Sequence, residues 1–147
     1  MKNFITGLAM FMLLIIFPIQ TSLEIINEHR ANRFHNIVYV SAQKARKEGC
    51  FTEEIIYDLE LDLKELVESY NGDTSKIEID VEESRKKRKG SFNFDGVING
   101  NFEDVIYYDI SIPIGKIVAT PALFNISKED NEYIIRRKGF VLSEYLD

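Results

Sequence analysis

The sequence contains no tryptophan and only one cysteine, Cys50, among its 147 residues. A single thiol excludes an intramolecular disulfide and any metal site built from several cysteines. The chain also lacks the H-E-x-x-H, C-x-x-C, G-x-S-x-G and glycine-rich phosphate-loop motifs. We therefore expect no enzymatic activity and no cofactor. A hydrolase site made of two carboxylates from distant parts of the chain would not be revealed by such motifs.

Basic residues are also in the minority. The chain has 18 Lys and Arg against 24 Asp and Glu, which gives a net charge of −6 at pH 7. An acidic protein does not attract nucleic acid through its overall field, so nucleic acid is not an expected partner. The length of 147 residues allows one modest hydrophobic core but leaves no room for a second catalytic domain.

The longest apolar run lies near the N-terminus, where residues 4–19 include only Thr6 and Gly7 as weakly polar positions. A continuous helix over residues 4–26 would be roughly 34 Å long, which is enough to cross a hydrocarbon core of about 30 Å. We predict a membrane anchor in residues 1–26 and an extracytoplasmic α+β domain in residues 27–147. Membrane lipid is thus the first expected partner.

Two other interpretations of this run remain open: a cleaved signal peptide, and a buried helix of a soluble protein. A signal peptidase needs small residues before its cut, and the best candidate cut, after Ser22, places Gln20 at the −3 position. A short N-terminal segment, followed by an apolar run like that of a signal sequence, favours a cytoplasmic N-terminus. The basic residues that flank the run, Lys2 on one side and Arg30 and Arg33 on the other, do not settle the orientation by themselves.

Helical spacing continues beyond the apolar run. No proline or glycine interrupts residues 19–48, and Gly49 follows where a helix needs a left-handed residue to end. We predict one helix of about 45 residues whose second half is amphipathic. Its expected buried stripe is Ile26, Arg30, Phe34, Ile37, Val38, Ser41 and Ala45. Pro18 lies inside this helix and predicts an anchor kink, either a simple bend or a hinge that lets the anchor pack against partners.

A second helix and several strands follow. Thr52 is a suitable N-cap, two glutamates come next, and apolar residues recur with helical spacing as far as Tyr70. Alternating patterns then predict strands at residues 77–82, 104–116 and 132–142, with a short additional strand at 92–94. Pro113 indicates a strand end or edge. The expected fold is α+β, with an antiparallel sheet of three to four strands packed on the two helices.

The residue types that most often carry chemistry are sparse and scattered. His29 and His35 are six positions apart, so they lie on different sides of a helix and cannot bind one metal ion together. Cys50 lies at the junction of the two helices without an assignable base. We interpret it as structural, with a dimerising or reactive thiol as the alternative.

Five consecutive basic residues form the most distinctive local feature: Arg85, Lys86, Lys87, Arg88 and Lys89. A run of like charge is commonly a solvated loop. The functional interpretation is an anionic-contact loop that binds lipid head groups, a wall polymer or nucleic acid. Both interpretations stay open at this point.

A short head, an apolar helix that becomes amphipathic, and an antiparallel sheet packed on it together resemble the plan of type IV pilins. More narrowly, the segments FPIQTSLEIINEHR and KARKEGCFTEEI are similar to small Gram-positive membrane proteins that resemble minor subunits of tight-adherence (Flp-type) pili. In a pilin, a leader would be cut after Gly7 and a glutamate would follow five residues later, where this chain has Met12. The resemblance therefore implies an uncleaved or atypical minor component.

The resemblance implies a non-enzymatic pilin-like subunit of a pilus, secretion or DNA-transfer apparatus. Its expected partners are other pilin-like or assembly subunits, with self-association as a further candidate. A secreted or anchored module that binds an anionic wall polymer through its basic loop is the alternative function.

Overall fold

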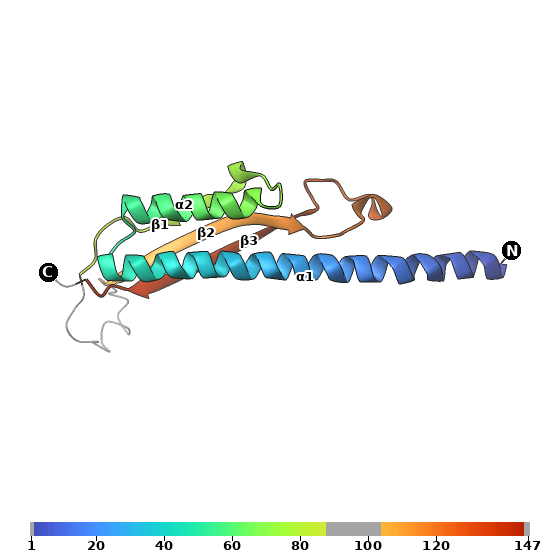
Figure 1. Ribbon diagram of the computed structural model, residues 1–147, viewed down its shortest axis with the longest axis horizontal. Helices are drawn as coiled ribbons and strands as arrows, with labels where there is room; N and C mark the ends of the chain where they lie inside the picture. Colours follow the sequence, from blue (N-terminus) through green and yellow to red (C-terminus); the bar gives the residue numbers. More distant parts are fainter. Residues whose placement is uncertain (1, 88–103, 146–147) are drawn as a thin grey trace.

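The computed structural model describes residues 2–87 and 104–145. In chain order, the elements are α1 (Lys2–Glu48), α2 (Glu53–Glu68), the short 3-10 helix η1 (Thr74–Lys76), β1 (Glu78–Val81), β2 (Val105–Lys116), η2 (Pro121–Phe124) and β3 (Glu132–Leu142). The prediction of an α+β fold with two helices and an antiparallel sheet is confirmed (Figure 1). The short strand predicted at 92–94 lies outside the described residues.

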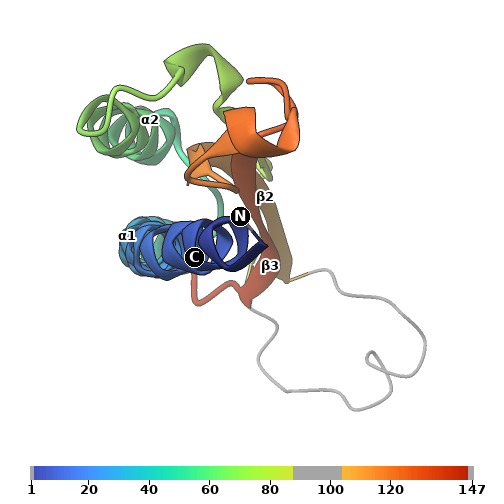
Figure 2. The same cartoon turned by 90° about the vertical axis from the view of Figure 1, so that its right-hand side faces the viewer.

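The sheet has the order β1-β2-β3, and both neighbouring pairs are antiparallel. The central strand β2 directs one row of large apolar side chains inward, as the alternation predicted. That row consists of Ile106, Tyr108, Ile110, Ile112 and Ile114, all of them buried. Both helices cover this one face of the sheet (Figure 2). The core therefore lies between the second half of α1, α2 and β2.

The junction between the helices follows from local sequence. Gly49 has a φ of 82°, a conformation that costs glycine little, and its N–H donates to the carbonyl of Ala45 at 2.8 Å. The hydroxyl of Thr52 then caps α2 by accepting from the N–H of Ile55 at 3.4 Å. The chain thus reverses direction, and α2 runs back along α1.

The predicted buried stripe of α1 is confirmed from Phe34 to Ala45 but is wrong at Ile26, which is exposed. The neighbouring Asn27 is buried instead, because its side-chain amide donates to the carbonyl of Lys116 at 2.8 Å. The end of β2 leaves that carbonyl without a strand partner at this point. A polar side chain satisfies it better than isoleucine would.

Helix α1 is continuous across Pro18. The hydroxyls of Thr21 and Ser22 donate to the carbonyls of Phe17 and Pro18 at 3.0 and 2.8 Å. Hydroxyls that bond back to the preceding turn often accompany slight bends in a helix. The kink at Pro18 stays a prediction.

Pro113 occupies the part of β2 beyond Ser111, where the pairing of β2 with β1 has ended, as its missing N–H requires.

The outer face of the sheet carries an ion-paired cluster. The carboxylate of Asp109 accepts two hydrogen bonds from Arg136, each at 2.6 Å, and lies 2.7 Å from the ammonium of Lys138. Hydrogen bonds from Arg136 and then from Lys138 lower the pKa of Asp109 from 3.8 to about 2. The cluster therefore links the central strand to β3 in its charged form.

Replacing Asp109 with asparagine is expected to destabilise the protein at neutral pH but not near pH 2. Because the folded-state pKa is depressed, the carboxylate stabilises the fold above its unfolded pKa near 3.8, and this contribution disappears as the pH falls to about 2. Urea midpoints of the full chain in detergent, measured from pH 7 down to 2, should converge for the two proteins. Asp62→Asn, which changes an exposed carboxylate on α2, is the matched control. A constant gap between D109N and the parent at all pH values would contradict this account.

Candidate functional site

The first half of α1 is an uncovered apolar surface. The most apolar 18-residue window of this helix has none of its residues buried inside the chain, and the helix is long and apolar enough to span a membrane. The side chains of Phe4, Phe11, Leu14 and Phe17 are all largely exposed to the surroundings. Such a surface needs lipid or other helices around it, because exposed apolar area of this extent is unfavourable in water.

Gln20 joins α1 to the connection between β2 and β3. Its side-chain Nε2 donates to the carbonyl of Ile117 at 3.0 Å, and its Oε1 accepts from the N–H of Ala119 at 3.0 Å. Residues 3–19, about 26 Å of helix, precede this contact. Sequence reasoning did not foresee it, although Gln20 is the first amide side chain after the apolar run.

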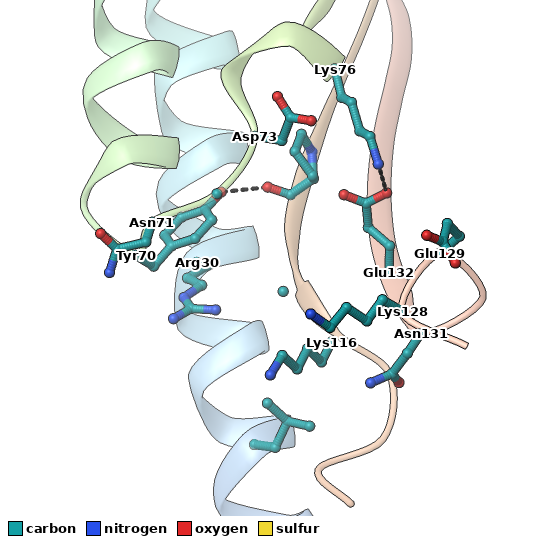
Figure 3. Close-up of a pocket in the computed structure, with 14 residues that line it drawn as sticks. Arg30, Tyr70, Asn71, Asp73, Lys76, Lys116, Lys128, Glu129, Asn131 and Glu132 are labelled. Atoms are coloured by element: carbon teal, nitrogen blue, oxygen red, sulfur yellow. Dashed lines mark hydrogen bonds and ion pairs between the residues drawn. The ribbon is translucent and has the colours of Figure 1, made fainter. Parts of the chain in front are cut away.

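An open cavity of about 560 Å³ lies between α1, the end of α2 and the end of β2, at the end of the domain nearer the N-terminus of α1 (Figure 3). We call it the base cavity. The guanidinium of Arg30 lies 4.2 Å from the centre of the Tyr70 ring and donates to the carbonyl of Ile114 at 2.8 Å. The hydroxyl of Tyr70 donates to the carbonyl of Pro113 at 2.6 Å. These bonds tie α1 and α2 to the end of β2.

The charges around this cavity are mixed. Lys76 forms an ion pair with Glu132, while Lys116 and Lys128 contribute two further ammonium groups to the lining. Burial raises the pKa of Tyr70 to about 12, against the opposing effect of Arg30. Tyr70 is therefore protonated at physiological pH and acts as a structural hydrogen-bond donor.

The start of the basic run is bound to the opposite end of the domain. The N–H of Lys86 donates to the carbonyl of Gly49 at 2.7 Å, and the hydroxyl of Ser143 donates to the carbonyl of Lys86 at 2.6 Å. The guanidinium of Arg85 lies 4.8 Å from the centre of the Tyr145 ring. Hydrogen bonding to Cys50 contributes most to raising the pKa of Arg85. Arg88 and Lys89 lie outside the described residues.

This position separates the basic run from the apolar part of α1. Lys86 lies beside Gly49, which is 23 positions after Ile26, and this separation corresponds to about 35 Å of helix. That distance is several times the screening length of about 8 Å at physiological salt. If α1 spans a membrane, the head groups around it are out of reach of Arg85 and Lys86. An anionic contact by the run stays a prediction.

The histidines and the cysteine stay apart. His29 is exposed, whereas His35 is partly buried, and burial followed by the charge of Arg137 lowers the pKa of His35. Cys50 is buried at the junction of the helices. Among the residues that the structure describes, no three His, Cys, Asp or Glu side chains are grouped closely enough to hold a metal ion.

No family model, curated protein or solved structure matches this chain. The architecture itself is therefore the strongest guide to function: a long apolar N-terminal helix, a second helix folded back along it, and a three-stranded antiparallel sheet over both. Of the residues singled out from the sequence, Pro18 lies in the uncovered half of α1. Arg85 and Lys86 lie at the far end of the domain, and the structure does not bring them near Pro18.

Proposed function

We propose that this chain is a non-enzymatic minor pilin-like (pseudopilin) subunit of a pilus, secretion or DNA-transfer apparatus. The observation that carries the proposal is the shape of α1, a single helix whose first half is uncovered and whose second half forms part of the domain core. Type IV pilins share this plan. In such a subunit the uncovered half is held by lipid and packs sideways on partner helices during assembly.

The proposal includes a membrane topology. The anchor comprises residues 1–26, the N-terminus is cytoplasmic, and the α+β domain of residues 27–147 lies outside. The continuity of α1 supports the division into anchor and domain, because one helix leads from the anchor into the core of the domain (Figure 1). With Met12 in place of the pilin glutamate, the chain acts as an atypical minor component rather than as the main filament subunit.

The placement of the basic run favours a second candidate, a module that binds an anionic wall polymer. Arg85 is an exposed side chain at the end of the domain opposite to the uncovered half of α1. In the proposed topology that end faces away from the membrane. A polymer outside the cell would meet this surface first, and its negative charge would be attracted by the basic run.

Cysteine crosslinking in native membranes tests the subunit proposal. In a Cys50→Ala background, which removes the only thiol, single cysteines are placed at Phe11 or Leu14 on α1, and Phe140→Cys on β3 serves as the exposed control outside the anchor. We expect Phe11→Cys or Leu14→Cys to yield disulfide-linked dimers or adducts with partner subunits, because partner helices approach this surface. Phe140→Cys should yield far fewer. Chains that stay monomeric at both α1 positions, and that co-purify with wall polymer, would favour the second candidate.

A further inference from the structure

The connection between β2 and β3 carries a group of exposed apolar side chains. Within it, η2 forms the tip, which is the part of the domain that reaches furthest along α1 toward its N-terminus (Figure 1). We use the name apolar tip for five apolar residues of this connection, one directly after β2 and four in η2: Ile117, Pro121, Ala122, Leu123 and Phe124. Phe124 is 58% exposed, and Leu123 and Ile117 are exposed as well. Such side chains in a connecting loop are unusual for a surface that meets only water.

The stem of this connection is held in a defined position. The side-chain amide of Asn131, which is buried, accepts from the N–H of Val118 at 2.7 Å and donates to the carbonyl of Val118 at 2.9 Å. Gln20 binds the backbone at Ile117 and Ala119 through both ends of its own amide. The bonds of Asn131 thus close the base of the connection, and those of Gln20 fix that base to α1.

The contact with Gln20 sets the depth of the tip relative to a bilayer. A hydrocarbon core of about 30 Å takes about 20 helical residues. A span that begins at Asn3 therefore ends near Ser22, and Gln20 lies in its last turn. The apolar tip reaches from Gln20 toward the N-terminus of α1 (Figure 1). For a span over residues 3–22, this places the tip at the level where acyl chains meet head groups.

The chain becomes polar again directly after the tip. Lys128, Glu129 and Asp130 are all exposed, and Lys128 lines the base cavity together with Lys116. Apolar residues followed directly by charged residues are typical of segments that lie in a membrane interface, where the apolar part meets acyl chains and the charged part meets water. Because this segment carries one basic and two acidic groups, it does not attract anionic lipid, and burial of apolar area is the expected driving force.

We propose that the apolar tip inserts into the outer interface of the same bilayer that α1 spans. This inference rests on the anchor of the proposed function. It adds a second membrane contact, and two points of attachment fix the rotation of the domain about the axis of α1. The orientation of the domain relative to neighbouring subunits would then be constant.

Because the protein has no tryptophan, single-tryptophan variants can report on this insertion. The full chain is reconstituted into phosphatidylcholine vesicles whose acyl chains are unbrominated, brominated near the head group to report on the tip, or brominated near the terminal methyl to report on the middle of α1. Phe124→Trp reports on the tip, Phe11→Trp on α1, and Phe140→Trp on the outer face of the sheet. The exposures of the parent residues are closely matched at 58, 60 and 62%. We expect blue-shifted emission and quenching by brominated lipid for F11W and F124W, and neither for F140W.

The three variants separate the possible failures. Quenching of F11W without quenching of F124W would overturn the insertion of the tip and leave the anchor intact, whether the F124W emission is red-shifted in water or blue-shifted by a protein partner. Absence of quenching for F11W would overturn the anchor and the tip together. Equal quenching of F140W and F124W would mean that the whole domain lies on the lipid, which would also overturn a contact specific to the tip.

Discussion

Replacing Phe34 with alanine is expected to lower the free energy of unfolding by about 3–5 kcal/mol. Phe34 lies on the inward face of α1, is fully buried, and belongs to the cluster that joins α1, α2 and β2. Its removal leaves a cavity that three elements border, and strands and helices of a packed core close such a cavity only in part. A loss of this size is a large fraction of the stability of an ordinary domain.

Hydrogen exchange of the β2 amides, with the full chain in detergent micelles, measures this effect. A change of about 3–5 kcal/mol corresponds to a roughly hundredfold to several-thousandfold loss of protection in the slowest amides. The matched control is Phe17→Ala, the same substitution on the same helix at a side chain that is 75% exposed. F17A should leave β2 protection unchanged. Equal protection in F34A and F17A would show that α1 contributes little to the core of the domain.

Replacing Gly49 with alanine is expected to cost about 2–4 kcal/mol through backbone strain and a lost hydrogen bond. The φ of 82° disfavours any side chain, and a Cβ at this position would lie 2.6 Å from the carbonyl oxygen of Lys86 and 2.9 Å from the Cβ of Tyr145. The N–H of Lys86 donates to the Gly49 carbonyl at 2.7 Å, so movement of either segment weakens that bond. The substitution therefore disturbs the helix junction and the start of the basic run together.

Gly7→Ala is the matched control on the same helix. Among the described residues, no atom outside the local helix lies within 4 Å of a Cβ at Gly7, and its backbone is helical. Thermal unfolding of the full chain in detergent should show a clear decrease in midpoint for G49A and none for G7A. Limited proteolysis should also cleave G49A faster near Lys86. If G49A and G7A unfold at the same temperature, the left-handed junction is not a source of stability.

Much of the fold was predictable because its signals are local. The helical spacing from Phe34 to Ala45, the glycine after Glu48 and the cap at Thr52 each determine backbone conformation within a few residues. The alternation in residues 104–116 identifies the buried face of β2 in the same way. At Ile26 this reasoning was wrong, because the end of β2 brings an unpaired carbonyl to α1 and favours Asn27 in the interior.

By itself, the sequence determined the order of the elements, the apolar N-terminal helix and the acidic charge of the chain, because propensity, periodicity and composition act on neighbouring residues. Only the tertiary structure placed the start of the basic run beside Gly49 and the apolar tip beside Gln20. Those contacts join residues 37 and 97 positions apart in the chain. They depend on how α2 and the sheet fold back along α1, and no local pattern encodes the resulting distances. The same folding back buries the second half of α1 in the core and leaves its apolar first half uncovered.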